Sequence, residues 1–214
     1  MKCEVKQLSE CPQHMETVGN WIFHEWWSKR HDSAEVVFTW LRTHKQKDKI
    51  PFTVVALADG TPVGSCSVIE NDCVFRKQYT PWVAAVFVKP EMRHRGIASA
   101  VLQEAAAIAL RAQVKGLYID CLAITAPVYE KNGWRVYERE VRDKDSVVML
   151  RTIEDRSRRA EHGAPPNGGP AMSGQDKGKP VPRDTRFTRV WVKQKGRWRG
   201  GCQPLLLTDY AAIT

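Results

Sequence analysis

The chain has 214 residues and a formal net charge of +9 at pH 7, with 43% hydrophobic and 27% charged residues. This length accommodates one domain of about 150 residues with its own hydrophobic core, followed by an extension. The excess positive charge lies mainly in residues 151–214, which contain 13 Lys and Arg against 6 Asp and Glu. The first 150 residues therefore need no nucleic-acid partner to account for their charge.

The cysteines and the hydrophobic segments indicate the compartment. The six cysteines, at positions 3, 11, 66, 73, 121 and 202, include no Cys-x-x-Cys pair, and no apolar signal segment opens the sequence. Free thiols in a reducing compartment are therefore expected. No apolar run approaches the ~20 residues that are needed to cross a bilayer. We accordingly expect a soluble, cytoplasmic protein without a membrane partner.

The N-terminal segment is predicted to form one strand followed by two helices. The strand covers residues 3–8. The first helix has an apolar face whose members recur at helical spacing: Met15, Val18, Ile22 and Trp26. Asp32 and Glu35 have the spacing of a capping box, which predicts the start of a second helix. The Trp residues of this segment are interpreted as core residues, with an aromatic wall for a ligand as the alternative.

Three strands are predicted next. Residues 52–58 and 62–69 have the composition of strands, and Asp59-Gly60 between them is typical of a two-residue hairpin turn. The run from Trp82 to Val88 is apolar throughout and has the length of a strand. Such a run is expected for a strand that is buried on both faces.

A glycine-containing loop leads from this strand into a long helix, which is predicted to start near Ser99 because apolar residues recur at helical spacing from Val101 onward. Gly96 lies at the junction. The start of a helix leaves unpaired N–H groups and a positive dipole end, which suit a phosphate pair. Arg93 and Arg95 add positive charge. The segment predicts an anion site, with an ordinary strand and amphipathic helix as the alternative.

The remaining elements complete the predicted domain. Residues 116–122 have the composition of a strand, and residues 125–132 of a short helix with Gly133 as its C′ residue. Residues 134–142 and 146–152 are predicted to form a closing antiparallel pair. This order of elements indicates an α+β domain with a mixed, largely antiparallel sheet.

The composition changes toward the C-terminus. Between residues 163 and 182, 10 of 20 residues are Gly or Pro, which is typical of a flexible linker. We divide the chain into a domain at 1–153, a Gly/Pro-rich linker at 154–182 and a basic C-terminal extension at 183–214. Within the extension, alternating residues around Lys195-Gly196 indicate a hairpin that is docked on the domain, shared between subunits or disordered.

Two motifs carry a resemblance to a known family. The segment Arg93-His94-Arg95-Gly96-Ile97-Ala98 matches the Arg/Gln-x-x-Gly-x-Gly/Ala motif of the GCN5-related N-acetyltransferases (GNAT), and it follows a Val88-x-Pro90 strand end as in that family. The segment Val128-Tyr129-Glu130-Lys131-Asn132-Gly133-Trp134 resembles the family's Phe-Tyr-x-x-x-Gly-Phe helix and turn. Together they cover roughly residues 50–150 in the family's order. The resemblance implies a GNAT-like fold in which two central parallel strands splay apart.

The resemblance also implies a binding site for acetyl-coenzyme A as co-substrate, in the gap between the strands at residues 82–88 and 117–122. Backbone groups of Val86, Phe87 and Val88 would pair with the pantetheine and the thioester. Backbone N–H groups of the loop and helix start would hold the diphosphate: Arg93, His94, Arg95, Gly96, Ile97, Ala98 and Ser99. No metal is expected.

The implied reaction is attack of an unprotonated amine on the thioester carbonyl, with an N–H group of the central strand stabilising the oxyanion. Tyr129 matches the family's general-acid tyrosine, which protonates the leaving thiolate. The alternative is a packed tyrosine that is bonded to a backbone carbonyl. The asparagine that many relatives carry seven residues before this tyrosine is replaced by Leu122.

An alkylamine is protonated near neutral pH, so a base must first remove a proton. Many members of the family carry a glutamate on the central strand, where this chain has Ala84 and Ala85. Asp72 is the preferred base, because Asp72, Arg76 and Thr80-Pro81-Trp82 resemble an Asp…Arg…Thr-Pro-Trp pattern in a bacterial subgroup of the family. Two further carboxylates are alternatives: Glu25 and Glu70.

These observations predict an N-acetyltransferase that transfers an acetyl group from acetyl-coenzyme A to a primary amine of a small molecule or peptide. A small-molecule acceptor is favoured because the sequence contains no evident partner-binding module. Nucleic acid is not expected as a partner, and a homodimer stays open. The alternative function is a non-catalytic coenzyme A-binding protein, or a regulatory protein that binds nucleic acid through its basic tail.

Overall fold

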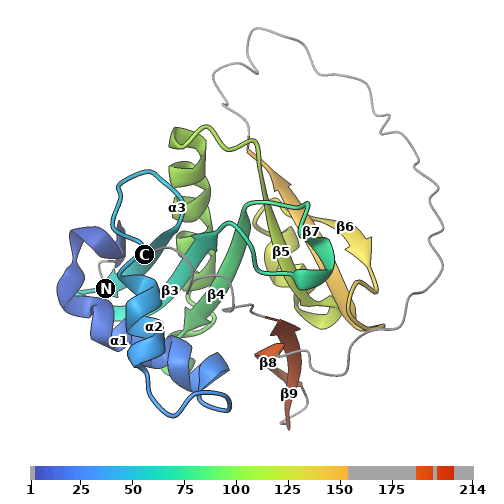
Figure 1. Cartoon of the computed structure of the whole chain (residues 1–214), viewed down its shortest axis with the longest axis horizontal. Coiled ribbons are helices and arrows are strands. Elements are labelled where there is room, and N and C mark those ends of the chain that lie inside the picture. The colour runs from blue at the N-terminus through green and yellow to red at the C-terminus, as the bar shows by residue number, and fades with distance from the viewer. Residues whose placement is uncertain (1–2, 154–186, 195–196, 205–214) are drawn as a thin grey trace, which may run out of the picture.

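A computed structural model describes residues 3–153, 187–194 and 197–204 (Figure 1). The predicted linker at 154–182 lies outside these residues, as do parts of the predicted extension at 183–214. The described residues form a seven-stranded sheet with helices on both faces and a separate two-stranded sheet. The predicted α+β fold is therefore confirmed.

The larger sheet has the strand order β1-β2-β3-β4-β5-β7-β6. Its strands are β1 (Cys3–Gln7), β2 (Phe52–Ala58), β3 (Thr61–Ile69), β4 (Trp82–Val88), β5 (Gly116–Leu122), β6 (Arg135–Arg139) and β7 (Ser146–Thr152). All neighbouring strands are antiparallel except β4 and β5, which are parallel. The one parallel pair lies at the centre of the sheet, and the chain can connect it only by a crossover. Helix α3 makes this crossover.

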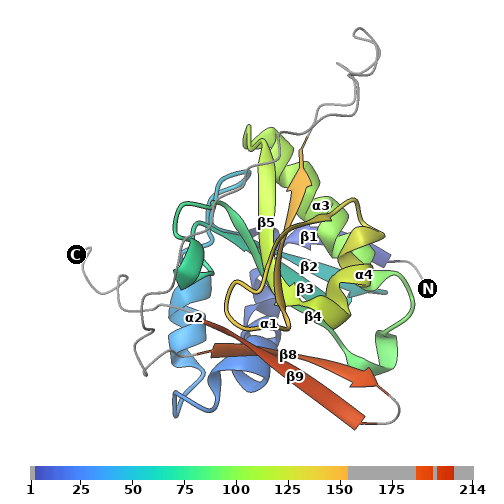
Figure 2. The same ribbon diagram turned by 90° about the vertical axis from the view of Figure 1, so that its right-hand side faces the viewer.

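The helices divide between the two faces of the sheet. The α-helices are α1 (Met15–Ile22), α2 (Glu35–Leu41), α3 (Ile97–Arg111) and α4 (Ala126–Glu130), and a π-helical turn at Phe23–Trp27 extends α1. Short 3₁₀ turns occur at Leu8–Glu10, Pro12–His14, Val74–Arg76, Pro90–Met92 and Ala123–Thr125. In Figure 2, α1 and α2 lie on one side of the strands and α3 and α4 on the other.

Two hydrophobic cores stabilise this arrangement. On one face, α3 packs on β2 and β3 through residues such as Leu102. On the other face, α1 and α2 cover the sheet through residues such as Leu41. Successive side chains of β2 alternate between the two cores, so that Val54 joins the first and Val55 the second. Every residue of β2 is buried for this reason.

The predicted first helix changes its winding at its end. The α-helix stops at Ile22, and the Ser28 N–H then donates a hydrogen bond to the Phe23 carbonyl, five residues earlier, at 2.8 Å. The predicted apolar face nevertheless continues, because Val18, Ile22 and Trp26 are all buried. Such π-turns are frequent at functional sites.

The predicted capping box of α2 is wrong. The N-cap residue is Ala34, which makes no side-chain cap. The Ser33 hydroxyl, instead of the Asp32 carboxylate, accepts a hydrogen bond from the Glu35 N–H at 3.2 Å. A shorter side chain one residue closer to the helix therefore satisfies the free N–H group.

The second sheet contains β8 (Phe187–Gln194) and β9 (Arg197–Pro204), which pair in antiparallel fashion from Phe187 opposite Pro204 to Gln194 opposite Arg197. In Figure 2 this hairpin runs below α1 and the end of β4. Within the described ranges no helix is both long and apolar enough to span a membrane.

Candidate active site

The parallel strands β4 and β5 diverge after a single pairing point, where Trp82 lies opposite Tyr118. The sequence predicts that β4 is buried on both faces. Its first three residues, Trp82 to Ala84, are buried, but the last four, Ala85 to Val88, are only half-buried. The prediction is wrong for this half because the divergence of β5 leaves one edge of β4 without a neighbouring strand. A gap therefore opens toward the carboxyl ends of both strands.

A β-bulge marks the place where the gap opens. Ser65 pairs with Phe87 and Ser67 pairs with Ala84, so β4 contains one residue more than β3 over this stretch. Ala85 has a φ of 49°, in the left-handed region that non-glycine residues seldom adopt. Strained backbone of this kind is concentrated at functional sites. Bulges are over-represented next to active sites, where they change the direction of a strand.

A cavity of about 400 Å³ occupies the gap, between the end of β4, the start of α3, α4 and the π-helical turn. Nearly all the residues that the resemblance assigns to cofactor binding line this cavity: Val86, Phe87, Val88, Arg93, His94, Gly96, Ile97, Ala98 and Ser99. Arg95 does not line it, and its side chain is exposed. The end of β4 and the loop that leads into α3 thus line one concave surface.

The start of α3 has the features of an anion site. The helix begins at Ile97, two residues before the predicted start, because Gly96 turns the chain with a φ of 79°. A Cβ atom on Gly96 would meet no atom within 4 Å, so glycine is required here for backbone conformation. No side chain caps the first N–H groups. Arg93 donates from Nε to the Val88 carbonyl at 3.1 Å, which ties the loop to β4.

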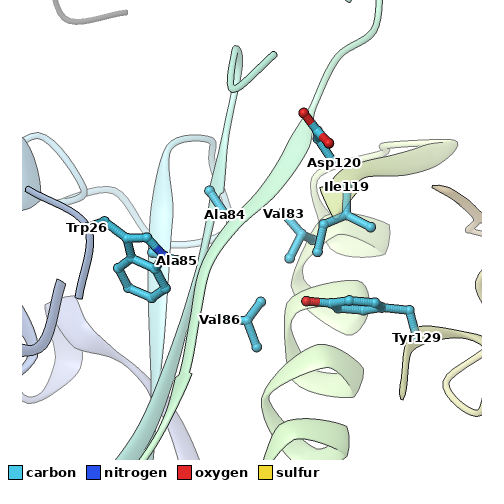
Figure 3. Close-up of a pocket in the computed structure, with 8 residues that line it drawn as sticks. All are labelled: Trp26, Val83, Ala84, Ala85, Val86, Ile119, Asp120 and Tyr129. Atoms are coloured by element: carbon cyan, nitrogen blue, oxygen red, sulfur yellow. The ribbon is translucent and has the colours of Figure 1, made fainter. Parts of the chain in front are cut away.

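Tyr129 enters the cavity from α4. The residue is buried, and its ring packs edge-on against Trp134 with ring centres 6.2 Å apart. Its hydroxyl points into the gap, toward Val86 (Figure 3), and makes no hydrogen bond to the described part of the chain. Burial, more than the neighbouring Cys121, raises the pKa of Tyr129 well above its usual value. The phenol therefore stays protonated at neutral pH and is available to a ligand.

Residues 15–134 match the family model of the acetyltransferase (GNAT) family. This segment is more than half of the chain and contains the gap, the anion loop and Tyr129. The chain belongs to the GNAT acetyltransferase family. This acetyltransferase is accordingly an acetyl-CoA-dependent acyltransferase. No curated protein matches its sequence.

Solved structures show the same fold at low sequence identity. An aminoglycoside 6′-N-acetyltransferase complexed with coenzyme A is 15% identical, with a TM-score of 0.55 over 72% of this chain and 98% of the other. The yncA protein of Salmonella typhimurium, solved with acetyl-CoA, is 16% identical, with a TM-score of 0.55 over 78% and 99%. A GNAT-family acetyltransferase of Streptococcus pneumoniae is 14% identical, with a TM-score of 0.55 over 71% and 100%.

Asp72, the preferred base from the sequence, lies outside the 400 Å³ cavity and outside a smaller cavity that adjoins it. It is 4% exposed, and its Oδ2 has no hydrogen-bond partner among the described residues. Burial, assisted by repulsion from Asp120 and opposed by Arg142, raises its pKa to about 8. Arg76, which belongs to the same sequence pattern, instead pairs with Glu138. The structure therefore does not bring Asp72 into contact with the cavity.

The two alternative bases differ in position. Glu25 lies on the π-helical turn, is half-buried and lines the 400 Å³ cavity. Burial raises the pKa of its carboxyl, and the positive charge of Arg93 partly offsets this effect. Glu70 lines neither cavity, and its buried Oε2 has no partner in the described part of the chain. Glu25 is thus the one predicted base that faces the cavity directly.

Sequence reasoning missed an ion pair behind the gap. Asp120 of β5 and Arg142 are 0% and 1% exposed, and Arg142 donates from Nε to Asp120 Oδ1 at 3.2 Å. Nε lies closer to Oδ2, at 2.9 Å, but is not directed at it. Burial raises the pKa of Asp120 to about 6 despite this partner. An aspartate inside the apolar strand Gly116–Leu122 is the signal that could have revealed the pair.

A second, smaller cavity adjoins the first, because Trp26, Val86 and Tyr129 line both (Figure 3). Its volume is about 10 Å³. Among the described residues no group of three or more His, Cys, Asp or Glu side chains is arranged to hold a metal ion.

Proposed function

We propose that this acetyltransferase transfers the acetyl group of acetyl-coenzyme A to a primary amine of a small molecule or a peptide. One observation carries the proposal. The uncapped start of α3, the unpaired edge of β4 and the hydroxyl of Tyr129 all border one cavity of about 400 Å³. Such a cavity has the size of a small-molecule site with a few convergent polar groups.

The diphosphate of the co-substrate fits the start of α3. The uncapped N–H groups at residues 94–99 and the positive end of the helix dipole attract an anion. Arg93, His94 and Lys131, which line the cavity, add positive or ionisable side chains on this side. The pantetheine, which can pair with backbone groups, fits the edge of β4 at Val86 to Val88. The thioester then lies near the bulge, between Ala85 and Tyr129.

The chemistry needs a proton donor for the departing thiolate. Tyr129 suits this role because its hydroxyl lies in the gap without a protein partner and its raised pKa keeps it protonated. After the amine nitrogen attacks and the C–S bond breaks, the thiolate takes the phenol proton. The nitrogen of the new amide loses its surplus proton in turn, directly or through solvent.

The amine must be unprotonated when it attacks. Asp72 stays our predicted base, and its position outside the cavities means that any proton would reach it through an intervening group. Glu25, which borders the cavity, is the alternative that needs no relay. Replacing each by its amide, as Asp72→Asn and Glu25→Gln, separates the two routes. Loss of the acidic limb of the kcat/KM profile in one variant identifies the base.

The proposal is tested by thiol release from acetyl-coenzyme A with a panel of amines: monoamines, polyamines, aminoglycosides and peptides with a free N-terminus. We expect amine-dependent release for at least one class, together with mass-spectrometric evidence for an N-acetylated product. Coenzyme A binding without acetylation of any class would favour a non-catalytic binding protein.

A further inference from the structure

The indole of Trp26 carries a buried donor that the protein does not use. Trp26 is 6% exposed, and its Nε1 has no hydrogen-bond partner among the described residues. A buried, unpaired N–H group costs of the order of 1–3 kcal/mol relative to a paired one. Buried indole nitrogens usually find a partner for this reason. A free one calls for an explanation.

The surroundings of the Trp26 nitrogen explain why it has no partner. Trp26 lines both cavities of the gap, including the smaller one. In Figure 3 the indole lies beside Ala85, with its nitrogen on the side of the ring that faces β4. Ala85 lies in the β-bulge of β4, beyond the single point at which β4 pairs with β5. The donor therefore lies at the inner end of the cleft, where the proposed function places the thioester.

Tyr129 faces the same small space from the opposite side of the gap. Its hydroxyl is directed at Val86 and, like the Trp26 nitrogen, has no partner in the described ranges. The cavity that both residues line offers about 10 Å³, which suffices for roughly one water-sized group such as a carbonyl oxygen. Both side chains thus border a space that is large enough for about one acceptor atom.

Local backbone structure explains how Trp26 reaches this position. The π-helical turn Phe23–Trp27 is wider than an α-helical turn, and it begins directly where α1 ends. Trp26 packs in the core between the helices and the sheet, together with Phe23 and Trp27. The indole is therefore held by packing, which keeps the direction of its N–H group fixed before a ligand arrives. Preorganised donors of this kind are the effective ones in catalysis.

We propose that Trp26 donates its indole N–H to the carbonyl oxygen of the acetyl thioester and, beside the strand N–H group that the family resemblance implies, stabilises the oxyanion that forms there. The proposal rests on the proposed acetyl transfer. As the amine nitrogen bonds to the carbonyl carbon, the π-electron pair moves to the oxygen, which accepts the hydrogen bond from Nε1. The pair then re-forms the carbonyl, the C–S bond breaks, and the thiolate takes its proton from Tyr129. Trp26 keeps its own proton throughout.

The decisive variant is Trp26→Phe, which retains an aromatic ring and removes the N–H group. Loss of one oxyanion donor lowers kcat by about 10²–10³. The affinity for coenzyme A, which lacks the acetyl oxygen, is expected to stay within about twofold of wild type. A purely structural role would instead change stability and binding together with kcat.

The chain offers a control in Trp40 of α2. It is buried in the same core as Trp26, at 7% exposed. It lines neither cavity. Trp40→Phe is therefore expected to shift the thermal midpoint about as much as Trp26→Phe and to leave kcat within a few-fold of wild type.

A second measurement uses the wild-type protein. The indole ¹H–¹⁵N resonance of Trp26, assigned by comparison with the variant, should shift downfield with acetyl-coenzyme A and not with coenzyme A. An unshifted resonance, or a kcat of Trp26→Phe equal to that of Trp40→Phe, overturns the proposal. If the wild type transfers no acetyl group to any amine, the proposed function fails and this inference fails with it. Normal transfer with an unaffected Trp26→Phe variant refutes only the donor role.

Discussion

Two sets of groups line the cleft, one of backbone groups and one of side chains. The groups that the proposed function assigns to the co-substrate are mainly backbone groups, at the unpaired edge of β4 and the uncapped start of α3, and we call them the backbone wall. Side chains from both sides of the gap supply the remaining groups, which we call the side-chain wall: Glu25 and Trp26 from the π-helical turn and Tyr129 from α4. A backbone wall can be specified by a short, glycine-containing motif. A wall of side chains depends on how distant segments pack, and the proposed function assigns the proton transfers to it.

The largest expected effect comes from removing the acid on the side-chain wall. Tyr129→Phe deletes the hydroxyl in the gap, and loss of a general acid typically lowers turnover by about 10²–10⁴. The affinity for coenzyme A should change little, because the backbone wall is untouched. Steady-state kinetics and calorimetry measure the two quantities. Tyr137→Phe is the control, since Tyr137 is 44% exposed and lies outside both cavities. Equal turnover in both variants would remove the acid role.

The second prediction concerns Gly64, which lies against β4 and the first turn of α3. A Cβ atom on Gly64 of β3 would lie 2.8 Å from Ile97 Cγ2 and 2.9 Å from the Phe87 carbonyl oxygen. Gly64→Ala therefore pushes the first turn of α3 away from β4. Overpacking of this kind costs about 1–3 kcal/mol of stability, and we expect roughly tenfold weaker binding of coenzyme A by calorimetry.

Gly116→Ala provides the comparison for this prediction. Its Cβ would meet Leu150 Cδ1 at 3.1 Å, and this flexible side-chain end can move aside. Gly116 begins β5, away from the start of α3. We expect a smaller loss of stability and unchanged coenzyme A affinity. If both variants weaken coenzyme A binding equally, the position of α3 does not control the anion site.

The pH dependence of stability tests the environment of Asp72. Its folded-state pKa is raised to about 8 from the usual 3.8, mainly by burial. The folded state then binds more protons than the unfolded state between these values, so stability falls as pH rises across this range. Asp72→Asn resembles the protonated form. Thermal midpoints should therefore favour the variant over wild type at pH 8, with little difference at pH 4. A wild type that is the more stable protein at pH 8 would contradict this assignment.

The smallest expected effect concerns Arg95, which is exposed and does not line the cavity. Its charge acts on the diphosphate only through solvent, where such interactions amount to about 0–1 kcal/mol. Arg95→Glu should weaken coenzyme A binding a few-fold at low salt, and Arg95→Ala less. Both effects should shrink as ionic strength rises. Identical affinities for the two variants and wild type would place the diphosphate elsewhere.

The sequence predicts the backbone wall well. The run from Trp82 to Val88 and the motif around Gly96 specify a strand, a turn with positive φ and a helix start, and each is a local property. The mixed, largely antiparallel sheet follows from the order of elements and was confirmed. Local signals also place Asp59-Gly60, where both residues adopt positive φ as a two-residue hairpin requires.

The side-chain wall was predicted only in part. Tyr129 was found through a family motif, whereas Trp26 was interpreted as core because its helical spacing fits an apolar face. It is indeed buried, and the property that matters, an indole N–H without a partner, depends on the π-turn and on the divergence of β5. Asp72 was chosen from a linear pattern. Its distance from the cavity results from tertiary packing that no local pattern encodes.

The central claim is that backbone N–H groups at residues 93–99 bind the diphosphate of coenzyme A. Calorimetric titration of the folded wild-type protein with coenzyme A, and separately with pantetheine, tests it most directly. We predict clear binding of coenzyme A and at least roughly tenfold weaker binding of pantetheine, which lacks the diphosphate. No heat with coenzyme A, or equal affinity for the two compounds, would contradict the account.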